Sequence, residues 1–152
     1  HHTVNYPDAS AEKDILRLNR AESVDEPNAP AKKISAESIF TARKEIMAIH
    51  MNENVEEYLI QLVLASRNPG NYSNDLKEWI DFGASPRATI ALDRCARSLA
   101  WLEDVDYVSP DHIQAVAADV LRHRLILSFE AEANGVSTDQ VISELLSLVP
   151  IG

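Results

Sequence analysis

The chain has 152 residues, which is enough for one domain that buries its own core without a disulfide or a bound metal. Its hydrophobic fraction of 45% is that of an ordinary globular protein. The formal net charge of −10 argues against broad contact with the phosphate backbone of nucleic acids, so no nucleic-acid partner is expected.

The N-terminus and the single cysteine bear on where the protein is found. His1 and His2 are interpreted as a tag remnant, and because no initiator Met is present we expect a piece of a longer protein. The sequence contains no signal-peptide pattern, and no apolar run approaches the roughly 20 residues that span a bilayer. Cys95 has no second cysteine to pair with, which fits a reducing compartment. We therefore expect a cytoplasmic protein with no membrane partner.

The first 34 residues contain a short helix and a linker. Asp8 and Ser10 are typical helix-start residues, and apolar residues follow them at helical spacing. Pro27 and Pro30 lie in a stretch with almost no large apolar side chain, which indicates a linker or an exposed loop. We divide the chain into three parts: residues 1–20 with the first helix, a linker over 21–34, and a helical domain over 35–152.

Two helices and a short helical segment are predicted before residue 83. Ser35 suits an N-cap because its hydroxyl can accept a hydrogen bond from an unpaired backbone N–H. Asn54 with Glu57 resembles a second cap, and Pro69-Gly70 should end the helix that follows it. One or two helical turns are expected for a later apolar cluster, made of Leu76, Trp79, Ile80 and Phe82.

The clearest element begins at Ser85-Pro86, where serine can cap a helix and proline suits the first helical position. The spacing predicts a helix from about 86 to 103. Its apolar face is expected to consist of Ala88, Ala91, Leu92, Cys95, Leu99 and Leu102. On this face Cys95 is interpreted as a small buried hydrophobe rather than a nucleophile.

The C-terminal third repeats these helix signals. Ser109-Pro110 is a second start of the same kind, and Ser137 with Gln140 forms a capping-box pattern before a last helix. Gly135 is a natural stop for the segment before it. The best strand candidates, residues 125–127 and 3–5, are both short, so the predicted class is mainly α, a helical bundle with a short extended N-terminal piece.

Motifs of catalysis are largely missing from the chain. The four glycines never form a phosphate-binding loop, and the histidines are too scattered to predict a metal site. No catalytic residue is expected in this fragment alone. The basic run Arg122-His123-Arg124 has two interpretations: an ordinary helix C-terminus, where cations are favoured, or a contact for an anion or a partner.

Arg87 stands out because it follows Ser-Pro at a helix start, where the helix dipole mildly disfavours a cation. Ala91, four residues downstream, offers it no charge partner. A cation at a position that the helix dipole disfavours suggests a role outside the helix itself, such as binding a phosphate. From the residues alone, this role and a structural salt bridge both stay open.

The run Gly83-Ala-Ser-Pro-Arg-Ala-Thr89 resembles the second sensor motif of the MoxR-type AAA+ ATPases. The similarity extends from about Tyr6 to Pro150 and includes further stretches at residues 62–67, 99–102, 106–111 and 120–125. The chain departs from the family pattern at Asp104-Val105, where family members usually carry Gly-Arg. Walker A, Walker B, the first sensor and the arginine finger belong to a core subdomain that this chain lacks.

The resemblance implies that residues 35–152 are the lid subdomain and that residues 1–20 are the end of the core. It implies that Arg87, with Pro86 and Ser85, contacts the γ-phosphate of ATP bound in the core. ATP and Mg²⁺ are then cofactors of the parent protein, with neither expected on the fragment. The fragment alone would be no enzyme, whereas the parent would be an ATPase with a chaperone-like role in maturing partner complexes.

The partners implied by the resemblance are the AAA+ core, neighbouring subunits of a ring, expected to be a hexamer, and von Willebrand factor A domain proteins. Two other functions compete with this one. A free-standing helical adaptor for protein–protein contact is suggested by Trp101 and the acidic surface. A helix-turn-helix nucleic-acid binder is suggested only by the short helices and Arg122–Arg124, and the net charge disfavours it.

Overall fold

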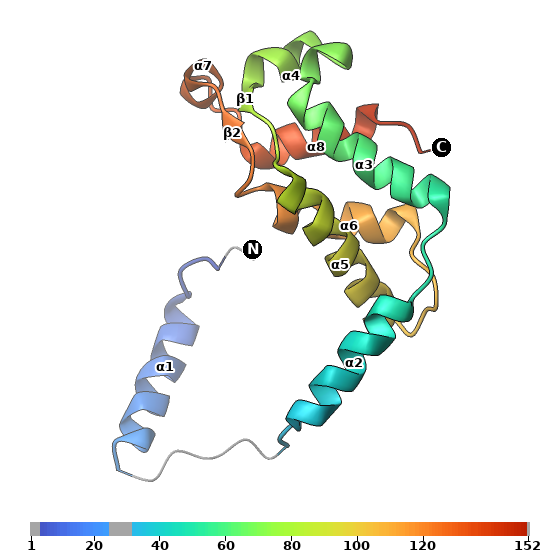
Figure 1. Cartoon of the computed structure of the whole chain (residues 1–152). Helices are drawn as coiled ribbons and strands as arrows, with labels where there is room; N and C mark the ends of the chain where they lie inside the picture. The colour runs from blue at the N-terminus through green and yellow to red at the C-terminus, as the bar shows by residue number, and fades with distance from the viewer. Residues whose placement is uncertain (1–3, 25–31, 152) are drawn as a thin grey trace. The chain divides into compact units, whose positions relative to one another are not determined.

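The computed structural model describes residues 4–24 and 32–151 and is mainly helical, which confirms the predicted class (Figure 1). The residues fall into two compact units, one up to Ile39 and one from Phe40 onward. The domain division at residues 20 and 34 stays a prediction, and residues 25–31 of the predicted linker lie outside the described part.

Helix α1 (Ala9–Glu22) begins where the sequence predicted and continues two residues into the expected linker. Asp8 is its N-cap, because Oδ1 accepts hydrogen bonds from the backbone N–H groups of Ser10 (3.0 Å) and Ala11 (2.8 Å). The bond from Ala11 and the further bonds from Ser10 lower the pKa of the Asp8 carboxyl, since they favour its charged form. The strand expected at 3–5 is wrong for Val4 and Asn5, and Thr3 lies outside the described residues.

The elements after α1 follow one another with short connections. In chain order they are α2 (Ala36–Ala48), α3 (Glu53–Arg67), the 3-10 turn η1 (Pro69–Asn71), α4 (Asn74–Trp79), β1 (Ile80–Phe82), α5 (Pro86–Leu102), α6 (Pro110–Leu121), β2 (Ile126–Leu127), α7 (Phe129–Ala133) and α8 (Thr138–Leu148).

The local capping chemistry is mostly as predicted. Ser35 Oγ accepts from the backbone N–H of Ser38 at 3.0 Å, and Ser137 with Gln140 forms the expected capping box before α8. The cap of α3 is Asn52 rather than Asn54: Asn52 has an extended backbone, and its Oδ1 accepts from the backbone N–H of Val55 at 2.9 Å. Asn54 fails as a cap because it is already inside the helix.

A small antiparallel sheet corrects the helical turns expected near residue 80. Leu76 and Trp79 belong to α4, but Ile80 and Phe82 lie in β1. Ile80 pairs with Leu127 of β2, and Phe82 with Ile126. The strand predicted at 125–127 is confirmed for its last two residues, and each strand forms only because the other, more than 40 residues away in sequence, supplies its hydrogen-bond partners.

The core lies where α3, α5, α6 and α8 pack together (Figure 1). The predicted apolar face of α5 is partly wrong, since Cys95 is exposed and Leu102 is 73% exposed. The face that packs inward repeats every four residues and consists of Ala88, Leu92, Ala96 and Ala100. Small side chains on this face let α5 approach α6 and α3 closely, so the inward face carries mostly alanine and the larger residues turn outward.

The turn between α5 and α6 holds a backbone feature that fits the departure from the family pattern. Asp104 has a φ of +59°, in the left-handed region, at the first of the two positions where the resemblance implies Gly-Arg. Most L-residues are disfavoured in this region by about 1–2 kcal/mol. Glycine avoids this strain, but it loses more conformational entropy on folding, which offsets part of the benefit.

We therefore expect Asp104→Gly to raise the free energy of unfolding by about 0.5–1 kcal/mol, measured by urea denaturation of the chain. Asp104→Ala is the matched control, because it removes the carboxylate and keeps the Cβ. Equal stabilisation by both variants would contradict the backbone explanation and point to the charge instead.

Candidate functional site

Arg87 is the second residue of α5, directly after Pro86, and its side chain is exposed. Among the described residues it has no ion pair, so the salt-bridge interpretation of Arg87 finds no partner there. Ser85 occupies the N-cap position with an extended backbone, but its hydroxyl makes no cap hydrogen bond, contrary to expectation. Its carbonyl instead accepts from the N–H of Ala88 at 2.8 Å.

This helix start therefore concentrates positive charge. The guanidinium of Arg87 adds to the positive end of the α5 dipole, the first turn of α5 carries no acidic residue, and Arg87 has no ion pair among the described residues. Such a site favours an anion, and a guanidinium can hold a phosphate through two parallel hydrogen bonds.

The loop before α5 is held by the C-terminal end of α3. The N–H of buried Ala84 donates to Ser66 Oγ at 3.0 Å, and the carbonyl of the same residue accepts from Arg67 Nε at 2.7 Å. Ser66 is fully buried, and its hydroxyl also donates to the carbonyl of Val63 at 2.7 Å. Both backbone polar groups of Ala84 are thus bonded to α3, three residues before Arg87.

Gly83 lets the loop approach α3 this closely. A Cβ at this position would lie 2.3 Å from the carbonyl oxygen of Ser66 and 2.7 Å from the Cα of Arg67, both backbone atoms. The glycine that opens the sensor-like motif is therefore required by packing against α3. In the sequence, residues 65–67 are only part of the resemblance, and nothing there predicts their contact with the motif.

Ser66→Ala is expected to lower the free energy of unfolding by about 1–3 kcal/mol, because it leaves the buried N–H of Ala84 without its acceptor. Urea denaturation measures the change. Ser98→Ala is the matched control: Ser98 Oγ donates at 2.7 Å to a carbonyl of its own helix, Arg94 O, and its loss should cost less than about 0.5 kcal/mol. Equal losses in the two variants would contradict the role of Ser66.

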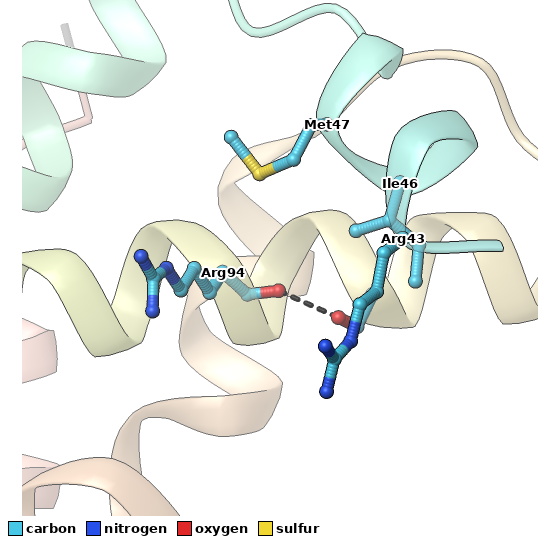
Figure 2. A pocket seen from close by; sticks show the side chains of 5 residues that line it. Arg43, Ile46, Met47 and Arg94 are labelled. Atoms are coloured by element: carbon cyan, nitrogen blue, oxygen red, sulfur yellow. Dashed lines mark hydrogen bonds between the residues drawn. The ribbon is translucent and has the colours of Figure 1, made fainter. Parts of the chain in front are cut away.

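A second surface feature is a cleft of about 450 Å³ between α2 and α5, lined by Arg43, Ile46, Met47, Arg94 and Ser98. Figure 2 shows Ile46 and Met47 extending from α2, with Arg94 on α5. The guanidinium of Arg43 lies over the ring of Phe40, 5.7 Å from its centre. Within the described residues neither Arg43 nor Arg94 forms an ion pair, so the lining of the cleft combines two apolar side chains with two cations.

The basic run after α6 has a structural role. Arg122 Nε donates to Asp139 Oδ1 at 2.8 Å, and its Nη1 donates to Asp119 Oδ1 at 3.1 Å. These bonds raise the pKa of Arg122. Burial, and then the charge of Arg124, lower the pKa of His123, whose Nε2 accepts from Arg124 at 2.6 Å. The ion pairs of Arg122 favour the structural interpretation of this run over an anion site.

The remaining candidates offer little chemistry. Trp101 is half-buried, and its indole N–H donates to Glu45 Oε2 at 3.0 Å, so its polar edge is already bonded within the chain. Among residues 4–24 and 32–151, no three His, Cys, Asp or Glu side chains gather where they could hold a metal ion. A search of the same residues finds no helix that is long and apolar enough to cross a membrane.

Comparison with known proteins finds a matching family model and several similar chains. Residues 74–145 match the family model of the AAA lid domain. The chain is 36% identical over 151 residues to chaperone MoxR1 of Mycobacterium tuberculosis, covering 97% of this chain and 38% of that protein. Protein MoxR of Paracoccus denitrificans is 37% identical over 84 residues, covering 52% of this chain and 25% of that protein.

A solved structure of a candidate ATPase from Cytophaga hutchinsonii superimposes with a TM-score of 0.86 and 38% identity. It covers 98% of this chain, and the chain covers 45% of it. The chain therefore spans less than half the length of each of these proteins.

Residues 74–145 are thus similar to an AAA lid domain, and the mainly helical fold is consistent with this match. Over nearly its whole length the chain resembles the C-terminal part of MoxR-family AAA+ ATPases, which confirms the recognition made from the sequence.

Proposed function

We propose that this chain is the lid subdomain of a MoxR-type ATPase and that it supplies Arg87 to the γ-phosphate of ATP bound in the core. The observation that carries the proposal is the placement of Arg87: exposed, without an ion pair among the described residues, and fixed at a helix start by α3. Pro86 holds the first turn because its ring fixes φ, and the Ser85 hydroxyl, which caps nothing, is free to donate to a phosphate oxygen.

The chemistry expected of Arg87 is electrostatic. Phosphoryl transfer builds charge on the equatorial oxygens of the γ-phosphate, and a fixed guanidinium stabilises that charge. Hydrolysis removes the γ-phosphate, so the contact is lost and the lid can rotate against the core. Among the described residues no cluster of side chains suits Mg²⁺, and no step proposed here depends on the ion.

The assembly follows from the same family. AAA lid domains belong to proteins that form rings, and we propose a hexamer with contacts to the core and to neighbouring subunits. A cytoplasmic, chaperone-like role in maturing partner complexes, including von Willebrand factor A domain proteins, completes the proposal. The relative named chaperone MoxR1 supports it. The adaptor alternative is weakened by the internal hydrogen bond of Trp101.

The test is ATP turnover by the full-length parent protein with and without Arg87→Ala, alongside the melting temperature of both. A sharp loss of turnover at an unchanged melting temperature is expected, because Arg87 makes no stabilising ion pair in the described residues. Wild-type turnover in the variant would remove the arginine assignment. The 152-residue chain alone is expected to hydrolyse no ATP.

A further inference from the structure

We propose that Ser66 and Arg67, at the C-terminal end of α3, are positioning residues that set the direction of Arg87 through the backbone of Ala84. This inference rests on the proposed contact of Arg87 with ATP. It adds that the contact depends on two side chains distant from the motif in sequence, and that α3 is the element to which the sensor arginine is mechanically joined.

The geometry leaves little freedom between α3 and Arg87. Ala84 is bonded on both sides, its N–H to Ser66 Oγ and its carbonyl to Arg67 Nε. Between Ala84 and Arg87 lie only Ser85 and Pro86, whose φ is fixed by its ring. The carbonyl of Ser85 is itself held by the N–H of Ala88. A displacement of Ala84 would therefore be carried directly to the first turn of α5.

α3 is suited to transmit such a displacement to the rest of the lid. Its inward side chains form much of the core and are almost fully buried, namely Tyr58, Leu59, Leu62 and Val63. Packed cores deform little, so a helix held in this way moves together with its neighbours. Force on Arg87 from a bound phosphate would reach the lid core through Ala84 and α3.

The two positioning residues differ in how they can be tested. Ser66 is fully buried, so its replacement also changes stability. Arg67 is exposed and its bond to the Ala84 carbonyl is only partly buried, so losing this bond should cost less stability than losing the buried bond to Ser66. Arg67 is therefore the residue whose variant separates a positioning role from a structural one.

The experiment compares Arg67→Ala, Arg67→Lys, Arg87→Ala and the Arg67→Ala/Arg87→Ala double variant in the full-length protein. For Arg67→Ala we expect kcat for ATP hydrolysis to fall about tenfold, with KM and the melting temperature little changed.

Arg67→Lys should recover most of the loss, since its ammonium can still donate to the Ala84 carbonyl. The double variant should be no slower than Arg87→Ala alone, because Arg67 acts through Arg87. Lys44→Ala, which removes an exposed cation from α2, is the control and should match the wild type.

Three outcomes would overturn this inference. Wild-type kcat in Arg67→Ala would show that the contact does not position Arg87. Loss of kcat in step with a large fall in melting temperature would show a structural role only. Multiplicative losses in the double variant would show that Arg67 acts independently of Arg87. If Arg87→Ala itself keeps wild-type kcat, the proposed function fails, and this result is distinguishable from the other three.

Discussion

Arg87→Ala in the full-length protein is expected to lower kcat for ATP hydrolysis about 100- to 1,000-fold, the usual loss when one fixed donor to a developing anionic oxygen is removed. The start of α5 is bonded to α3 through Ala84, which would hold Arg87 in place as a fixed donor, and its removal leaves no equally fixed donor there. Steady-state turnover at saturating ATP measures it.

Arg87→Lys sharpens this prediction. Lysine keeps the charge but presents a single ammonium in place of the planar fork of arginine. We expect its kcat to lie between those of the wild type and Arg87→Ala. A lysine variant as slow as the alanine variant would mean that the paired donors of the guanidinium matter more than its charge. A fully active lysine variant would show that the paired donors are not needed.

Gly83→Ala is expected to destabilise the isolated chain by about 3 kcal/mol or more. The added Cβ would lie 2.3 Å from the backbone oxygen of Ser66 and 2.6 Å from its carbonyl carbon, and neither atom can move without shifting α3. Gly83 does not have a left-handed φ, so the cost is steric rather than conformational. Urea denaturation of the chain gives the free energy of unfolding.

Gly70→Ala is the matched control for Gly83→Ala. Its Cβ would meet only the flexible side chain of Lys77, with the nearest atom at 3.2 Å, so a change within about 0.5 kcal/mol is expected. If both variants lose the same stability, the effect belongs to glycine in general and the close contact with Ser66 is not its cause.

Features that depend on residues close together in the sequence were predicted well, and features that depend on distant residues were not. Helix starts at Ser85-Pro86, Ser109-Pro110 and Ser137 were predicted because their signals lie within one turn of the chain. The strand at 80–82 was not, because it depends on pairing with residues 126–127. The inward face of α5 was predicted only in part, because spacings of three and four also included Cys95 and Leu102, whereas the buried face repeats every four residues and is mostly alanine.

The candidate site divides in the same way. Arg87 stood out in the sequence because a cation at a helix start breaks a local rule, and the structure adds that it has no ion pair among the described residues. The hydrogen bond between the Ala84 N–H and Ser66 Oγ could not be predicted, because the two residues are 18 apart in sequence and only the folded chain brings them together. A serine and an arginine at the end of an apolar helix were the only signal available.

The most direct test of the central claim is the affinity of the full-length protein for a non-hydrolysable ATP analogue and for ADP, measured by titration calorimetry with and without Arg87→Ala. If Arg87 contacts the γ-phosphate, the variant should bind the analogue about tenfold or more weakly and bind ADP with unchanged affinity, because ADP lacks the group that Arg87 holds. Equal changes for both nucleotides, or no change for either, would contradict the assignment of Arg87 as the sensor of the γ-phosphate.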